Sequence, residues 1–419
     1  GAAFILIYLV FLVLLGLPIL VSEFAVGRSS RLSTARAFHK LEPEGSNFHK
    51  YSYMGMIGNY MLMMFYTMVA GWMMYYGYVM ATGKLSGASS DEVSGFFSNL
   101  MTSTGTMTGW MIVAVLLAFG VCSLGLQNGI ERITKVMMVC LLTIMVVLCV
   151  KSCTLPGAIE GIKFYLLPDF GRLKENGLLS GIYAAMGQAF FTLSLGIGAM
   201  AIFGSYIDKD RSLMGESIQI GILDTFVALM AGLIIFPACF AYNVSPTQGV
   251  GLVFVTLPNM FNQMMGGRFW GALFFIFMTF AALSTIIAVF ENILSFAMDL
   301  WGWSRKKAVL VNGIAIFVLS MPCVLGFNVW SGFQPLGAGS TIQDLEDFII
   351  SNNLLPLGSL VYLLFCVTRY GWGWDNFIKE ADTGNGIKFP KWARPYLTYV
   401  LPLIVLLIFV MGYYDKFFR

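Results

Sequence analysis

At its centre the chain reads Gly187-Gln188-Ala189-Phe190-Phe191-Thr192-Leu193-Ser194-Leu195-Gly196-Ile197-Gly198, inside an apolar segment from about residue 178 to 207. Such a segment is long enough to cross a bilayer as a helix. However, its midpoint carries amide and hydroxyl side chains followed by two glycines, and glycine inside a helix costs about 1 kcal/mol relative to alanine. We predict that the helix unwinds here, so that freed carbonyls and half-helix ends hold a small cation and a zwitterion. The alternative is that the glycines only let another helix pack closely.

The composition is that of a helical membrane protein with many spans. Of the 419 residues, 58% are hydrophobic and only 11% are charged, which excludes an ordinary soluble protein. The net charge of +3 is too small to suggest a nucleic-acid partner. The seven cysteines lie mostly in apolar runs, and the only histidines, His39 and His49, share one polar loop. We therefore expect no catalytic cluster and no transition-metal site, and hence no enzyme.

Ten apolar segments are predicted to span the membrane. They cover residues 2–27, 51–82, 108–126, 131–150, 179–207, 212–241, 269–300, 306–326, 343–369 and 393–414. Placing the loop 28–50 inside assigns 17 of the 25 lysines and arginines to inner loops and 8 to outer loops, as the positive-inside rule requires. We predict a multi-pass protein of the cell's inner (plasma) membrane.

The segments between the spans are polar or mixed in character. The outer loops 83–107 and 151–178 are expected to be surface connections, and the inner loop 370–392 a solvated linker. The outer loop 242–268 is apolar but interrupted by Pro246 and Pro258, so it is either a lid that folds back or an ordinary packed loop. Because the chain opens at Gly1 without a methionine or a basic leader, we expect a further helix to precede it.

Ionisable residues are rare within the spans. Asp224 lies near the middle of its span, where a charge costs about 2.5–3.5 kcal/mol and usually faces a cavity or a partner. A functional role is the first interpretation for this residue, and a structural hydrogen-bonded carboxylate is the second. Four further acidic residues lie nearer to span ends, where both interpretations stay open: Glu23, Glu291, Asp299 and Asp347.

Three polar groups are predicted to lie at similar depth in the membrane. Thr192 and Ser194 belong to the interrupted segment, Asp224 to the next span, and a third group consists of Ala281, Ser284 and Thr285. Spacings of three and four place the third group on one helical face. Hydroxyl, carbonyl and carboxylate oxygens suit a hard cation such as Na⁺. Alternatively, the two neighbouring hydroxyls bond back to carbonyls of their own helix.

Residues 187–196 resemble the sixth helix of the neurotransmitter:sodium symporters, most closely that of the bacterial amino-acid members. The resemblance continues along almost the whole chain, in the order that the family has. It is carried by residues 1–28, ending in Ser22-Glu23-Phe24-Ala25-Val26-Gly27-Arg28, by Phe65-Tyr66 with Trp72, by Ser205-Tyr206, and by residues 224–232, 281–285 and 304–306.

The resemblance implies an all-α polytopic membrane protein with the leucine-transporter fold and its inverted repeats. The ten spans would be the family's helices 2 to 11. Residues 1–178 would form an incomplete first repeat (helices 2–5), residues 179–369 the second repeat (helices 6–10), and residues 370–419 an inner loop and helix 11. The family's first helix would be missing, so that both sodium sites are incomplete in this chain, which would be a fragment of a working transporter.

The resemblance also implies roles for individual residues. The first Na⁺ site would use Thr192 and Asp224, and the second would use Ala281, Ser284 and Thr285. The substrate would contact Leu62, Tyr66, Phe191, Thr192, Ser194, Ile197 and Val289, with Tyr66 on its carboxylate and Phe191 as an outer lid. Gln188 and Asp347 would belong to an outer gate and Tyr206 and Asp299 to an inner gate, while Glu23 would accept hydrogen bonds from amides of the unwound turn.

We therefore predict sodium-coupled symport of a hydrophobic L-amino acid, aromatic or large aliphatic, by alternating access. Chloride-dependent relatives carry Asn and Ser where this chain has Asp224 and Ala228, so transport should not require chloride. The expected partners are the amino acid and the lipid bilayer, and no oligomer is required. A membrane sensor that binds an amino acid without moving it is the main alternative, and a channel is another.

Overall fold

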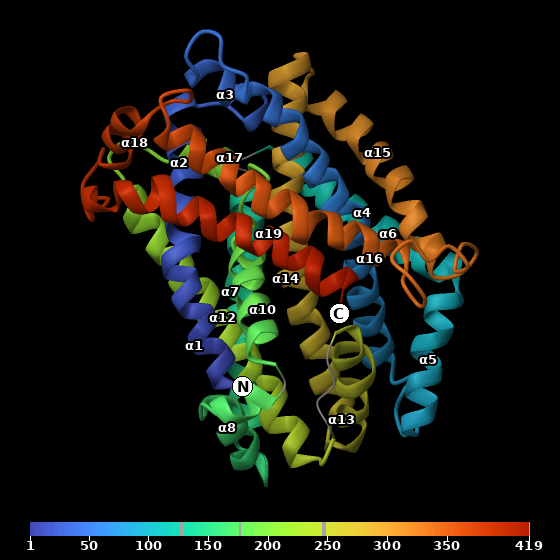
Figure 1. Ribbon diagram of the computed structural model, residues 1–419. Helices are drawn as coiled ribbons and strands as arrows, with labels where there is room; N and C mark the ends of the chain where they lie inside the picture. Colours follow the sequence, from blue (N-terminus) through green and yellow to red (C-terminus); the bar gives the residue numbers. More distant parts are fainter. Residues whose placement is uncertain (126–129, 176, 245–248, 419) are drawn as a thin grey trace.

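The computed structural model describes residues 1–125, 130–175, 177–244 and 249–418 and is built of helices (Figure 1). The first half contains α1 (Ala2–Phe11), η1 (Leu12–Gly16), α2 (Leu17–Ser30), α3 (Thr34–Leu41), η2 (Phe48–Lys50), α4 (Tyr51–Thr82), α5 (Ser90–Thr102), α6 (Thr104–Ser123), α7 (Arg132–Cys153), α8 (Ala158–Leu166), α9 (Phe170–Glu175), α10 (Leu178–Thr192) and α11 (Ala199–Tyr206). The second half contains α12 (Leu213–Ala241), η4 (Leu252–Thr256), α13 (Leu257–Gln263), α14 (Gly267–Trp301), α15 (Arg305–Gly326), α16 (Ile342–Ile349), η5 (Ile350–Leu354), α17 (Leu355–Val367), α18 (Trp374–Ala381), η6 (Lys391–Ala393), η7 (Tyr396–Val400) and α19 (Leu401–Phe417).

Each predicted span corresponds to one helix or to a short series of helices. Within the described residues, eight helical stretches are long and apolar enough to cross a membrane. The other two predicted spans correspond to α4, which is 32 residues long but rich in tyrosine and glycine, and to the pair α10 and α11. The prediction of a polytopic all-helical protein is confirmed, whereas the number ten stays a prediction.

The segment between α10 and α11 is unwound, as the sequence predicts. α10 ends at Thr192 and α11 begins at Ala199. Three residues of the interruption have positive φ angles: 50° at Ser194, 86° at Gly196 and 77° at Gly198. These angles are easy for glycine and costly for other residues, so the two glycines permit the break.

Helix α2 packs directly on α11, the second half of the interrupted pair. A Cβ added at Gly27 would lie 1.8 Å from the carbonyl oxygen of Ala201, and one at Gly204 would lie 2.7 Å from that of Phe24. The two backbones are therefore in contact, as small residues allow in membrane proteins.

The outer loops 83–107 and 151–178 lie largely at the surface, as predicted, but each contains a helix that the sequence did not indicate. The first contains α5, which begins with a capping box at Ser89 and buries Val93 and Leu100. The second contains α8, whose Tyr165 ring lies so close to Gly232 of α12 that an added Cβ would be 2.1 Å from it. Each of these short helices is amphipathic and buries apolar residues on one face, which the average composition of the loop does not reveal.

The outer segment 242–268 folds back on the helices as η4 and α13. The ring of Phe254 lies 5.7 Å from that of Trp72 and 5.6 Å from that of Phe97. Pro258 is the second residue of α13, which directly follows the π-helical turn η4. Pro246 lies outside the described residues.

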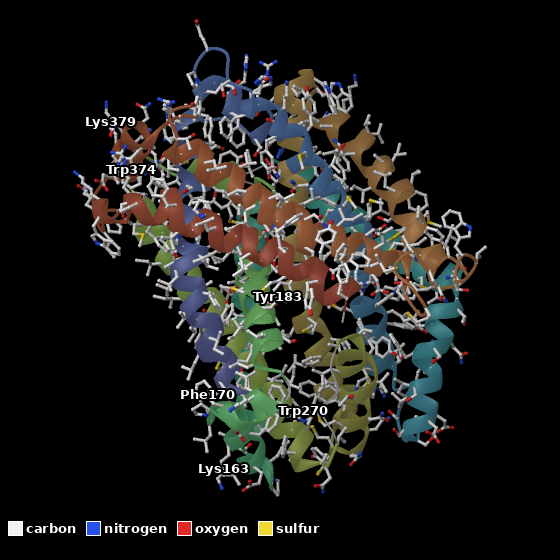
Figure 2. The ribbon with its side chains drawn as sticks, in the orientation of Figure 1. Lys163, Phe170, Tyr183, Trp270, Trp374 and Lys379 are labelled. Atoms are coloured by element: carbon white, nitrogen blue, oxygen red, sulfur yellow. The ribbon has the colours of Figure 1, made fainter. Side chains whose placement is uncertain are left out.

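The inner loop 370–392 is packed rather than solvated, which corrects the prediction. Its helix α18 buries Phe377 and Glu380, and the carboxylate of Glu380 lies 2.6 Å from Nε of the fully buried Arg28 and 2.6 Å from Nζ of Lys209. The Arg28 guanidinium also donates to the carbonyl oxygen of Arg211 at 2.6 Å. Figure 1 shows α18 and α3 near one end of the molecule and α8 at the other, and Figure 2 places Trp374 and Lys379 far from Lys163 and Phe170.

We expect Glu380→Gln to destabilise the folded protein, because it leaves the buried Arg28 guanidinium without its counter-charge. Breaking a buried ion pair in this way costs about 3–5 kcal/mol. The melting temperature of the purified protein should fall by several degrees. Asp375→Asn, the same chemical change on the exposed face of α18, is the matched control and should leave it nearly unchanged. Equal melting temperatures for the two variants would contradict the assignment.

Candidate functional site

A cavity of about 200 Å³ opens beside the unwound segment. Six of the predicted substrate-contacting residues line it together with two polar residues predicted for other roles and two that the sequence did not indicate. The lining residues are Leu62, Tyr66, Phe191, Thr192, Ser194, Ile197, then Gln188 and Thr285, and finally Ile350 and Leu355. The structure therefore gathers residues from α4, α10, α14, η5 and α17 around one space.

Val289 does not line this cavity in the structure, although the resemblance placed it there. It lies one helical turn beyond Thr285 on α14 and is packed in the hydrophobic core with only 2% of its surface exposed. Ile350 and Leu355 supply apolar surface to the cavity instead. They stand where the helix is interrupted by a π-helical turn, a feature that apolar periodicity does not signal.

Buried side chains from three other elements hold the unwound backbone. The carboxylate of Glu23 accepts a hydrogen bond from the amide of Gly196. The amide side chain of Asn59 donates to the carbonyl oxygen of Ile197 at 2.8 Å, and the Thr34 hydroxyl donates to that of Gly198 at 3.4 Å. A break in a membrane helix needs such partners, because lipid offers none.

The unwound segment also lies against the backbone of α17. A Cβ added at Gly196 would be 2.2 Å from the carbonyl oxygen of Leu355, and one at Gly358 would be 1.8 Å from that of Gly196. Neither position has room for a side chain. The two glycines therefore allow a close approach as well as an unusual φ angle.

Asp224 faces the end of α10. Its Oδ2 accepts hydrogen bonds from the Thr192 hydroxyl at 2.7 Å and from the Tyr8 hydroxyl at 3.3 Å. Among the residues that the structure describes, no basic side chain forms an ion pair with it. The site thus contains an uncompensated carboxylate beside an unwound turn, which is the environment that a cation would stabilise.

The third polar group lies on α14 as predicted, with its oxygens together. The hydroxyls of Ser284 and Thr285 both donate to the carbonyl oxygen of Ala281, at 2.8 and 3.4 Å. This is the back-bonded arrangement that the sequence left open. Each hydroxyl oxygen keeps lone pairs that can face a cation, so the arrangement is compatible with both interpretations.

Tyr206, Asp299 and Asp347, which were predicted to form gates, have hydrogen-bond partners outside the predicted gate pairs. On the inner side, Tyr206 donates to Glu291 at 3.2 Å, and Glu291 forms an ion pair with Arg305 at 2.5 Å. Asp299 accepts a hydrogen bond from the backbone amide of Ser33 at 2.8 Å. On the outer side, Gln188 lines the cavity, whereas Asp347 is exposed and accepts from the Ser351 hydroxyl at 2.8 Å.

Comparison with known proteins decides the family. The model of the sodium:neurotransmitter symporter family matches residues 1–94 and 89–416. The chain belongs to this family. It is 33% identical over 413 residues to an uncharacterised sodium-dependent transporter, YhdH, of Bacillus subtilis, which covers 98% of this chain and 89% of the relative. It is also 24% identical to the sodium-dependent serotonin transporter of Drosophila melanogaster, over 99% of this chain and 71% of that protein.

The symporter fold is also found in a solved structure. The crystal structure of MhsT in complex with L-phenylalanine superimposes with a TM-score of 0.86 and 35% sequence identity, covering 98% of this chain and 92% of that one. The family resemblance and the leucine-transporter fold predicted from the sequence are therefore confirmed. The protein is a multi-pass membrane transporter of a sodium-dependent family, and not an enzyme.

Besides Ile350 and Leu355, two polar residues of the symporter site were not predicted from the sequence. Asn59 is the one amide side chain in the apolar span 51–82, and Tyr8 lies in the largely apolar span 2–27. Burying an amide without a hydrogen-bond partner costs free energy, so a partner for Asn59 could have been predicted from the sequence. Its partner, the carbonyl of Ile197, is 138 residues away and could not have been named.

We expect Gly196→Ala to disrupt the symporter, because alanine has neither the room nor the preference for φ at this position. Gly187→Ala is the matched control, since an added Cβ there meets nothing within 4 Å and the residue lies inside α10. The first variant should show a lowered melting temperature and no substrate binding, and the control should resemble the wild type. Normal binding and stability in Gly196→Ala would rule out the tight contact with α17.

Proposed function

We propose that this protein couples the entry of sodium to the uptake of a hydrophobic L-amino acid by alternating access. The observation that carries the proposal is the convergence of an unwound backbone segment, the Asp224 carboxylate and a mainly apolar cavity around Thr192. A channel needs a continuous pore, whereas a small cavity beside a broken helix suits one bound substrate at a time. We place the protein in a bacterial inner membrane, as the charge bias and the bacterial relatives suggest.

The cavity favours an amino acid with a large apolar side chain. Leu62, Ile197, Ile350 and Leu355 offer apolar surface, while the Phe191 ring stands 37% exposed among the lining residues. The polar end of the substrate would meet the Tyr66 hydroxyl and the unwound backbone near Ser194. The structural relative was crystallised with L-phenylalanine, which supports an aromatic or large aliphatic substrate for this chain.

The oxygens present fit a hard monovalent cation. We assign Thr192 and Asp224 to a first sodium site and the Ala281 carbonyl, Ser284 and Thr285 to a second. Carboxylate, hydroxyl and carbonyl oxygens are the ligands that such ions prefer. When bound, sodium would supply the positive charge that Asp224 lacks among the described side chains. Thr192 lies between Asp224 and the cavity, so it connects the first ion site to the substrate.

The bundle that contains the interrupted helix is proposed to rock against a scaffold formed by other helices. The repeats assigned from the resemblance, residues 1–178 and 179–369, both contribute to the cavity, through α4 and through α10, α14, η5 and α17. On the inner side, the hydrogen bond of Tyr206 to Glu291 and that of Ser33 to Asp299 join different helices. Inward release would require these contacts to separate, which is the role proposed for the inner gate.

We expect uptake into vesicles by the full-length protein to require a sodium gradient and to saturate with substrate. Thr192→Val should weaken the sodium dependence by about tenfold or more, which corresponds to roughly 1.4 kcal/mol. Radiolabelled uptake with sodium replaced by N-methylglucamine is the measurement. Substrate binding without any uptake would favour a sensor, and flux that never saturates would favour a channel.

The substrate class can be tested by competition. L-Phenylalanine and L-leucine should suppress uptake or binding, whereas glycine and L-glutamate should not. Glycine has no side chain to fill the apolar part of the cavity, and none of the lining residues is a cation that could pair with the glutamate side chain. Initial rates with each competitor at the same concentration give the order. Preferential inhibition by glycine or glutamate would contradict the proposal.

We expect uptake to continue when chloride is replaced by gluconate. Asp224 supplies the negative charge that neighbours the proposed sodium site, and Ala228 has no hydroxyl with which to bind an anion. The double variant Asp224→Asn/Ala228→Ser should lose most activity in gluconate and recover part of it in chloride. Loss of wild-type uptake on chloride removal would show that the carboxylate does not have this role.

A further inference from the structure

The two histidines of the chain meet on one carboxylate at the inner end of the molecule. His39 lies on α3, His49 lies on η2, and Glu42 follows α3 directly. These are the only histidines in the 419 residues. The ligand atoms of the three side chains lie within 4.8 Å of one another. The sequence did not indicate this group, because the three residues come together only through the fold of the short loop.

The carboxylate at the centre of this group is fixed before any ligand arrives. Oε2 of Glu42 accepts a hydrogen bond from the backbone amide of His49 at 3.1 Å. Oε1 lies 2.5 Å from Nδ1 of His49 and 3.3 Å from Nδ1 of His39. The Glu42 side chain is only 5% exposed, whereas that of His39 is 76% exposed and that of His49 is 35% exposed.

The backbone amide of His49 holds the Glu42 carboxylate in place, and ligating carboxylates in known metal sites are oriented by hydrogen bonds of this kind.

One separation within the group equals that of a tetrahedral zinc site, and a second is shorter because the two atoms share a hydrogen bond. With bond lengths of about 2.0–2.1 Å, two ligands of such a site are roughly 3.3 Å apart. The Nδ1 atom of His39 already has this separation from Oε1 of Glu42. His49 would exchange its hydrogen bond for a metal bond by a shift of less than about 1 Å, and a water molecule could complete the coordination.

We propose that His39, Glu42 and His49 form a binding site for Zn²⁺ or a similar divalent transition-metal ion. Two imidazoles and one carboxylate are a ligand set found in zinc proteins, and alkali ions do not favour it. The ion would join the end of α3 to η2, immediately before α4. This proposal is independent of the proposed transport function, since none of its ligands lines the cavity.

The site can be tested with Co²⁺ as a spectroscopic probe and Zn²⁺ as its competitor. The full-length protein is purified with a tag that contains no histidine and is titrated with Co²⁺. We expect one ion per chain with the visible absorption of tetrahedral Co²⁺, and displacement by Zn²⁺. His39→Ala changes a mostly exposed side chain and should fold normally, yet it should weaken binding by about 100-fold or more, because it removes a ligand and even the loss of a ligand's hydrogen-bond partner costs about 10–100-fold.

Glu44→Gln is the matched control, because it neutralises an exposed carboxylate in the same loop and should bind as the wild type does. The seven cysteines could also bind Co²⁺, but thiolate ligation gives a near-ultraviolet charge-transfer band that two histidines and a carboxylate do not. A thiolate band, equal binding by His39→Ala, or no visible absorption on titration would each overturn the proposal.

Discussion

The unwound segment between α10 and α11, on which the candidate site depends, is stabilised by the hydrogen bond from the Gly196 amide to the Glu23 carboxylate. An unpaired backbone group in the interior of a membrane costs several kcal/mol, so a helix can unwind there only if other parts of the chain satisfy it. Glu23, Asn59 and Thr34 reach the interruption from α2, α4 and α3. The break is thus a property of the packed assembly, and the glycines only make it possible.

Much of the helical architecture could be predicted because bilayer thickness sets the length of an apolar span. The break could be predicted too, since Gly196 and Gly198 stand beside hydroxyls in an otherwise apolar segment. The short helices α5, α8 and α18 could not, because their burial depends on residues far away in sequence. Arg28 and Glu380, for example, are 352 residues apart, and a single sequence does not indicate that they pair.

The polar residues of the candidate site could be predicted from the sequence, but its apolar lining could be predicted only in part. Thr192 and Asp224 carry unusual polarity for their spans, and the structure brings them into contact. The apolar lining was harder, because any leucine, isoleucine or valine in a span can face either a cavity or a neighbouring helix. Val289 packs into the core, while Ile350 and Leu355 reach the cavity through an irregular turn that apolar spacing does not reveal.

The bonds of Arg28 have a mechanical consequence for the inner face. Its guanidinium joins the end of α2, the start of the segment leading into α12 and helix α18 at a single buried point. Separating these three parts would strand a positive charge in a medium of low polarity. Under the proposed alternating access they would move as one rigid joint, and a passage to the inner side would open elsewhere, where Tyr206 and Asp299 make their contacts.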